Sequence, residues 1–201
     1  MADDIFKTVG YHGTTARHKA DIERNGFDPD KTNRRNDHWL GNGVYFFDNV
    51  DLAKWWADTL VEKSGSQPLV YSAEIMARKS GVLDLDRPEE LNAFMNWCLT
   101  FYKDIKTHCV GKMPVFEPQQ FRGVFFDYYK EKKHIAVVLC TFNKTSPAYA
   151  PTRLTGTALK QRTDLMTALG LFFRERQICV SNKGCIGRPE IAYNYEEEEI
   201  I

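Results

Sequence analysis

The sequence predicts one mixed domain of helices and strands, in the α/β or α+β class. Its 201 residues are enough to bury a continuous core. Apolar and β-branched runs, typical of strands, are interspersed with runs that have the apolar spacing of helices. No internal repeat or linker divides the chain, so we expect a single domain over residues 1–195. A solvated acidic tail of residues 196–201, opening with four glutamates, follows it.

The first elements are predicted between Thr8 and Phe47. Thr8–His12 has the residues of a short strand, and Arg17–Arg24 carries part of the apolar face of a helix. Gly26 suits the C-terminal end of that helix. The polar segment Asp28–Asn42 predicts a long exposed loop, a kind that is often functional. The apolar run Val44–Phe47 predicts the next strand.

The pattern continues with a helix, two strands and a second helix. Asp51–Val61 has aromatic and aliphatic residues at helical spacing. Leu69–Met76 and Gly81–Leu85 have strand character. Pro88 is well suited to the first turn of a helix, which we expect over Glu89–Tyr102.

The second half is less regular. Lys103–Gln120 has no clear period, so no element is assigned to it. Gly123–Tyr129 and His134–Phe142 are rich in apolar, β-branched and aromatic residues and predict buried strands. We expect a long helix over Thr155–Phe172 and a final strand over Gln177–Ser181.

Composition limits the classes of function. Acidic and basic residues number 27 each, so overall charge gives no argument for a polyanionic partner. Five cysteines without a Cys-x-x-Cys pair predict neither a disulfide framework nor a zinc site, and no metal is expected. The sequence shows neither a secretion signal nor an apolar run long enough to span a bilayer. We therefore expect a cytoplasmic protein that makes no membrane contact.

Three segments far apart in the sequence carry the functional argument: Tyr11-His12-Gly13-Thr14-Thr15, Gly43-Val44-Tyr45-Phe46-Phe47, and Gln177-Ile178-Cys179-Val180-Ser181. In residue type, order and strand context they resemble the active-site motifs of ADP-ribosyltransferases. The resemblance covers residues 9–58 and 174–182 and leaves the middle of the chain unassigned. It implies an ADP-ribosyltransferase-like split antiparallel sheet with flanking helices around a cleft that binds NAD.

The resemblance also implies roles in binding NAD, which is the substrate. His12 matches the histidine that bonds a ribose hydroxyl, and Gly13 matches the glycine whose backbone holds the nicotinamide amide, with Thr14 beside it. Tyr45 and Trp56 match the two rings that enclose nicotinamide. In the alternative interpretation, the backbone satisfies His12, Gly13 is a turn residue, and the tryptophans are core anchors. We expect the core role for Trp55, the neighbour of Trp56.

Gln177 departs from the family pattern, which commonly has a catalytic glutamate there. Its amide can orient a ribose hydroxyl but cannot act as a base. Glu175 lies two residues earlier, on the same face of a strand, and is a candidate to contact or deprotonate the acceptor. The alternative is that Glu175 pairs with Arg174 or Arg176 at the surface.

Basic residues suggest further contacts. Arg34 and Arg35, in the long loop, are candidates to bind the pyrophosphate of NAD, because guanidinium groups grip two oxygens; a solvated charge pair is the alternative. Lys130 to Lys133 most simply form a polar turn between strands. Together with Arg34, Arg35, Arg17 and His18, they are also candidates for a nucleic-acid track.

These observations predict a mono-ADP-ribosyltransferase that releases nicotinamide and modifies a macromolecule. The preferred acceptor is RNA or DNA, with protein as the alternative. The resemblance to small stand-alone family members implies a bacterial toxin or anti-phage effector, with an antitoxin protein as a candidate partner. Two other functions stay open: an NAD-dependent RNA 2′-phosphotransferase, and a non-catalytic domain that binds NAD or a partner.

Overall fold

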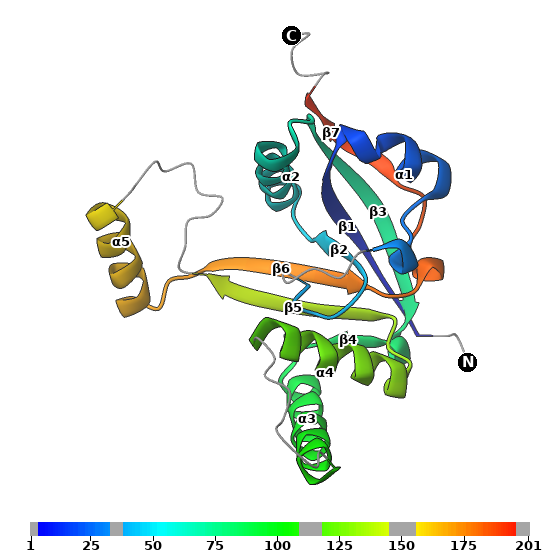
Figure 1. Cartoon of the computed structure of the whole chain (residues 1–201), viewed down its shortest axis with the longest axis vertical. Coiled ribbons are helices and arrows are strands. Elements are labelled where there is room, and N and C mark those ends of the chain that lie inside the picture. The colour runs from blue at the N-terminus through cyan, green and yellow to red at the C-terminus, as the bar shows by residue number, and fades with distance from the viewer. Residues whose placement is uncertain (1–3, 33–37, 109–117, 145–155, 196–201) are drawn as a thin grey trace.

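A computed structural model describes residues 4–32, 38–108, 118–144 and 156–195 of the chain (Figure 1). It is a mixed structure, so the predicted α+β class is confirmed. The strands are β1 (Ile5–Thr15), β2 (Val44–Phe47), β3 (Pro68–Arg78), β4 (Val82–Asp84), β5 (Val137–Lys144), β6 (Phe173–Val180) and β7 (Glu190–Asn194). The α-helices are α1 (Lys19–Asn25), α2 (Val50–Ser64), α3 (Pro88–His108), α4 (Pro118–Lys133) and α5 (Gly156–Ala168). Short 3-10 turns are η1 (Ala16–His18), η2 (Pro29–Lys31), η3 (Lys79–Gly81) and η4 (Lys183–Cys185).

The described strands form one sheet in the order β4-β5-β6-β2-β1-β3-β7. All neighbours are antiparallel except β4 and β5, which are parallel and are connected through α3 and α4. The sheet has two halves, because β1 and β2 pair at one position only, Tyr11 opposite Phe47. In Figure 1, β5 and β6 run across the direction of β1 and β3. The two halves are therefore joined by very little backbone pairing.

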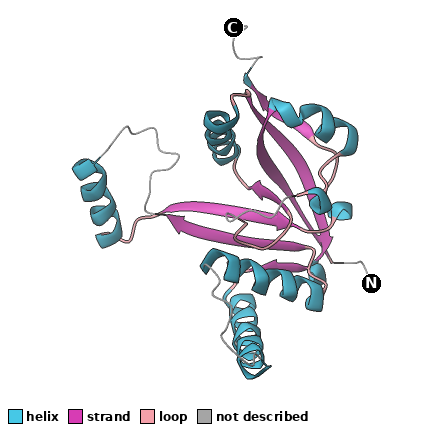
Figure 2. Ribbon diagram, viewed as in Figure 1, coloured by secondary structure: helices cyan, strands magenta, loops and turns pink. Residues whose placement is uncertain are grey.

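Helices cover the sheet in different places (Figure 2). α2 packs on β1 and β3, and its Leu52, Ala53 and Ala57 are buried against Phe47 and Val70. α3 and α4 lie beside β4 and β5 and close a second core. The largest core lies on the opposite face and includes Phe46, Tyr71, Ile75, Leu139 and Ile178. No helix in the described ranges is both long enough and apolar enough to cross a membrane.

The predicted strand Gly123–Tyr129 is wrong, because this segment is the middle of α4. Its aromatic side chains at Phe125, Phe126 and Tyr129 recur at helical spacing and are buried. Phe126 stacks on Phe94 of α3 with ring centroids 4.7 Å apart. A short aromatic run fits a buried strand and a buried helix equally well, and here packing against α3 decides for the helix.

Other boundaries also differ. β1 begins three residues before the predicted Thr8, and the edge strand β7 was not predicted. α5 ends at Ala168, four residues short of the predicted Phe172, after which Gly170 adopts a left-handed φ of 65°. The acidic tail lies outside the described residues.

Candidate functional site

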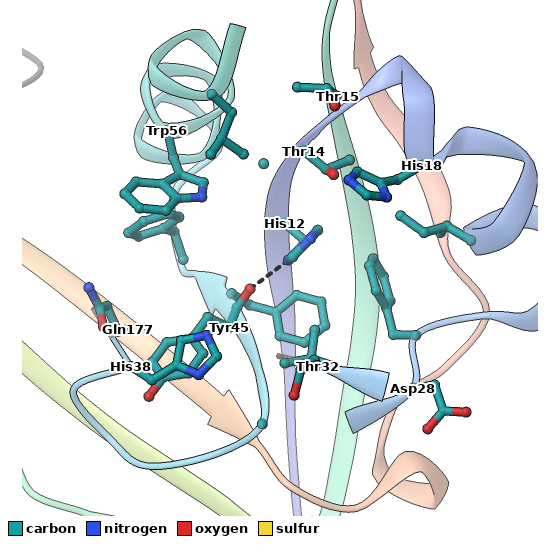
Figure 3. A pocket seen from close by; sticks show the side chains of 18 of the residues that line it. His12, Thr14, Thr15, His18, Asp28, Thr32, His38, Tyr45, Trp56 and Gln177 are labelled. Carbon is teal, nitrogen blue, oxygen red and sulfur yellow. Dashed lines mark hydrogen bonds between the residues drawn. The ribbon is translucent and has the colours of Figure 1, made fainter. Parts of the chain in front are cut away.

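A cavity of about 560 Å³ lies at the junction between the two halves of the sheet (Figure 3). β1, β2, α2 and β6 all contribute to its walls, together with the segments on either side of residues 33–37. Seven of the residues predicted from the motifs line it: His12, Gly13, Thr14, Tyr45, Trp56, Glu175 and Gln177. The two other predicted residues, Arg34 and Arg35, lie outside the described residues. The structure thus brings three distant segments of the sequence to one cavity.

His12 reaches the cavity from the middle of β1. Its Nδ1 lies 2.8 Å from the Tyr45 carbonyl oxygen. A carbonyl only accepts, so Nδ1 carries the proton, and in the neutral ring Nε2 is the acceptor. The ring also meets Phe27 and Phe46 edge-on, at centroid distances of 4.9 and 5.8 Å. One nitrogen is therefore satisfied by the backbone, as the alternative interpretation expected, while the ring still borders the cavity.

Gly13 is the point at which β1 and α2 meet most closely. A Cβ atom at this position would lie 2.1 Å from the Ala53 carbonyl oxygen, well inside van der Waals contact. Glycine therefore permits a close approach to the helix backbone as well as bordering the cavity. This contact seats α2 over β1, and α2 carries Trp56 into the cavity wall.

The Tyr45 side chain is held in place by contacts to its hydroxyl and to its ring. Its hydroxyl donates to the Gly41 carbonyl oxygen at 2.6 Å and accepts from the Leu40 amide at 2.8 Å. The His38 ring stacks on the Tyr45 ring, with centroids 4.8 Å apart and planes 21° from parallel. Burial strongly raises the pKa of the Tyr45 hydroxyl, so this group stays neutral. Tyr45 offers an aromatic face and not an acid or a base.

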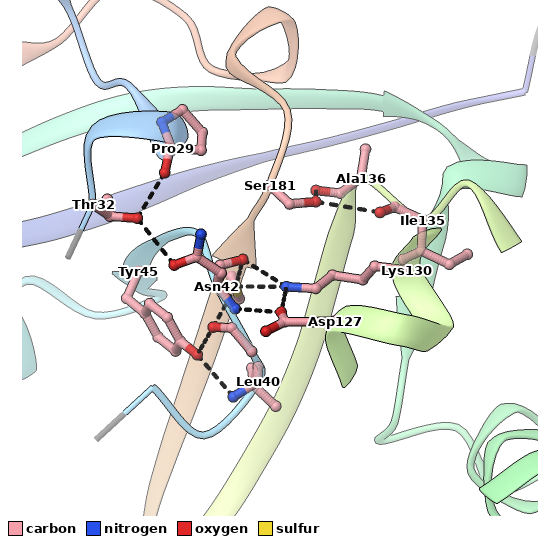
Figure 4. Close-up of polar contacts among 12 residues, drawn as sticks. Pro29, Thr32, Leu40, Asn42, Tyr45, Asp127, Lys130, Ile135, Ala136 and Ser181 are labelled. Carbon is pink, nitrogen blue, oxygen red and sulfur yellow. Dashed lines mark hydrogen bonds and ion pairs between the residues drawn. The ribbon is translucent and has the colours of Figure 1, made fainter. Parts of the chain in front are cut away.

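A polar clamp built on the buried Lys130 holds the backbone next to Tyr45 (Figure 4). The Lys130 ammonium, only 6% exposed, donates to the Asn42 carbonyl oxygen at 2.6 Å and pairs with Asp127 at 3.2 Å. The Asp127 carboxylate also accepts a hydrogen bond from the backbone N–H of Asn42 at 2.5 Å. The predicted polar turn at Lys130 is therefore wrong, because this lysine is buried in α4 and does not belong to a surface track. Cys179, 3.9 Å from Lys130, is a fully buried thiol whose pKa burial raises.

Glu175 and Gln177 lie side by side on β6, as their spacing predicted. The Gln177 Nε2 donates to the Glu175 Oε1 at 2.5 Å, and the Lys144 ammonium of β5 lies 2.5 Å from the Glu175 Oε2. Arg176 instead pairs with Asp84 and Asp86, so the alternative pairing with Glu175 is not formed. Both β6 side chains are buried, at 4% and 9% exposure.

The contact with Glu175 determines which atom of the Gln177 amide points away from Glu175. Because Glu175 requires a donor, the amide nitrogen points to it and the oxygen points away. That oxygen is buried and has no hydrogen-bond partner among the described residues. A buried acceptor without a partner is costly, and a ligand hydroxyl would satisfy it.

Aromatic and basic groups flank the β6 pair. Trp55 and Trp56, with ring centroids 6.0 Å apart, both line the cavity, so Trp55 is not the purely core residue that was expected. The Lys144 ammonium lies 4.7 Å from the centre of the Trp39 ring and 5.9 Å from that of Trp55. The roles of His38, Trp39 and Lys144 were missed, because each depends on contacts that sequence spacing does not reveal.

The opposite end of the cavity is also polar. Its lining includes Arg17, His18, Asp28, Lys31 and Thr32, from η1, η2 and their flanks. Basic groups therefore occur at both ends of the cavity. Among the described residues, no group of three or more His, Cys, Asp or Glu side chains is placed to hold a metal ion. No protein-family model and no curated protein matches this chain.

Proposed function

We propose that this protein is a mono-ADP-ribosyltransferase that transfers ADP-ribose from NAD to a macromolecular acceptor and releases nicotinamide. One observation carries the proposal: three segments resembling the family's motifs line one cavity, together with the two further predicted residues, Trp56 and Glu175. The cavity volume of about 560 Å³ falls in the range of small-molecule sites. An ADP-ribosyltransferase-like interpretation of the split sheet belongs to the same proposal.

The polar groups support binding of the nicotinamide ribose. The Gln177 oxygen is an acceptor, as is the Nε2 of a His12 ring in its neutral form, and ribose hydroxyls are donors. Trp56 and Tyr45 supply aromatic faces for nicotinamide, and such contacts contribute about 0.5–1.5 kcal/mol each beyond burial. The His38 ring already stacks on Tyr45, so a nicotinamide ring on that face would have to displace it.

The proposed reaction requires orientation more than a strong protein nucleophile. The bond between ribose C1′ and the nicotinamide nitrogen breaks, and its electron pair leaves with neutral nicotinamide. Positive charge develops on the ribose and is stabilised by nearby acceptors, as in glycoside hydrolysis. An acceptor nucleophile then bonds to C1′ and loses its proton. Glu175 is the nearest described carboxylate to Gln177 and the candidate to receive this proton.

A transfer assay tests the proposal. The protein is incubated with NAD labelled in its adenylate phosphate, together with RNA, DNA or bacterial lysate, while nicotinamide release is quantified. We expect labelled macromolecule and equimolar nicotinamide. We also expect a folded His12→Ala variant to lose at least about 100-fold in rate, since it lacks the ribose acceptor.

His134→Asn is the matched control, because His134 is exposed, lies outside the cavity, and has a φ of 56° that asparagine tolerates. It should retain full activity. NAD binding without turnover would instead indicate the non-catalytic domain, and removal of an RNA 2′-phosphate would indicate the phosphotransferase. Roles as a toxin or an anti-phage effector, and pairing with an antitoxin, stay predictions.

A further inference from the structure

We infer that the acceptor is a single-stranded nucleic acid, which binds on a patch running from Glu175 to the protein surface. The inference rests on the proposed function and names the acceptor class for the same cavity. The patch consists of Trp39, Trp55, Lys144 and Arg122, hereafter the tryptophan–cation patch. Its members come from four separate segments: the residues before β2, α2, β5 and α4.

Lys144 joins the patch to the catalytic end of the cavity. Its ammonium contacts Glu175 at 2.5 Å and lies within cation–π distance of both indole rings, at 4.7 and 5.9 Å. Trp39, Trp55 and Lys144 all line the cavity and all are partly exposed. A group bound on either indole is therefore next to the carboxylate proposed to take the acceptor's proton.

Arg122 extends the patch outward. It is exposed, does not line the cavity, and its guanidinium carbon lies 5.5 Å from the centre of the Trp39 ring. Phe142 meets Trp39 edge-on at 4.8 Å and so restrains the indole. Trp39 is thus a restrained aromatic ring with two cations, Arg122 and Lys144, close to it.

This combination of charge and aromatic surface favours a nucleic acid over a basic protein side chain. Two cations next to Trp39 repel a lysine or arginine acceptor, and the Glu175 charge is already matched by Lys144. A nucleotide supplies a flat base for an indole and a phosphate for Lys144 or Arg122. Stacking aromatics interleaved with basic residues are the usual means of binding single strands.

Binding of labelled oligonucleotides tests the patch without NAD. The probes are single-stranded DNA and RNA 12-mers of mixed sequence, measured by fluorescence anisotropy against the full chain. We expect Trp39→Leu and Trp55→Leu each to weaken binding about fivefold to 100-fold, which is the usual effect of losing one stacking contact. Arg122→Glu should weaken binding and flatten its salt dependence.

Arg188→Glu is the matched control, since Arg188 is an exposed arginine that does not line the cavity. Nicotinamide release by Arg188→Glu without acceptor should also equal that of the wild type. The inference is overturned if the wild type does not bind single strands, if the tryptophan variants bind like the wild type, or if Arg188→Glu weakens binding as much as Arg122→Glu. Labelling of lysate proteins that is insensitive to Arg122→Glu would also overturn it.

The two proposals fail in distinguishable ways. Strand binding that depends on the patch, without nicotinamide release from NAD under any condition, removes the transferase function and keeps the binding site. NAD cleavage with strand binding that does not depend on the patch removes the acceptor inference and keeps the NAD chemistry.

Discussion

Gln177 illustrates how one residue depends on its neighbour. Its amide nitrogen lies 2.5 Å from a Glu175 oxygen, a distance at which a donor is required. A glutamate at position 177 would bring two carboxylates into contact, and one of them would have to keep a proton. Glutamine is therefore the residue compatible with the Glu175–Lys144 pair at neutral pH.

The first prediction concerns Gln177→Glu. Two carboxylates in contact retain one proton in the folded state to a pH at which the unfolded chain has lost both, so folding stability falls as pH rises. At pH 8 we expect the free energy of unfolding to be about 1–3 kcal/mol below that of the wild type, as for a lost buried hydrogen bond. At pH 5 the difference should be much smaller. Urea unfolding at both pH values measures it.

Gln67→Glu serves as the control, because Gln67 is exposed and outside the cavity. It should leave the difference between pH 5 and pH 8 unchanged. Equal stability of Gln177→Glu and wild type at both pH values would show that the Glu175 contact does not form in solution.

Among the elements, the contact between β1 and α2 positions one wall of the cavity. Gly13 faces the Ala53 carbonyl, and three residues further along α2 is Trp56. A longer side chain on β1 must lift the helix and with it the tryptophan. The glycine of the first motif thus has a packing role that is independent of ligand binding.

We predict that Gly13→Ala lowers the free energy of unfolding by at least about 1–3 kcal/mol, the usual cost of overpacking. Gly81→Ala is the matched control: a Cβ there would lie 3.6 Å from the nearest atom, an ordinary contact, and should change stability little. Chemical unfolding of both variants measures the difference. Comparable stability of the two variants would contradict the close approach of α2 to β1.

Sequence patterns located elements better than they located contacts. The strands around His12, Tyr45 and Gln177 were predicted because short runs of apolar and β-branched residues are a local signal. Gly123–Tyr129 was assigned to the wrong class, because a short aromatic run fits a buried strand as well as a buried helix, and packing against α3 decides for the helix. The edge strand β7 was missed because it is only five residues long and forms by pairing with β3.

For the site as well, the sequence identified local segments but not the tertiary contacts between them. Residues within motifs were assigned to one cavity, whereas His38, Lys130 and Lys144 were not, since their partners are determined by tertiary contacts. Lys130 is 88 positions from the Asn42 carbonyl that it binds, and no local pattern links them. A buried lysine and an exposed one look alike in a sequence until the partner is known.

The central claim is that this cavity binds NAD, and calorimetric titration with NAD tests it most directly. We predict saturable, equimolar binding to the wild type. Trp56→Ala should bind NAD about two- to tenfold more weakly, because it lacks one aromatic face of the cavity. Tyr195→Ala, at an exposed aromatic position outside the cavity, should bind like the wild type. If the wild type shows no saturable NAD binding, or if a folded Trp56→Ala variant binds NAD as tightly as the wild type, the cavity is not the NAD site.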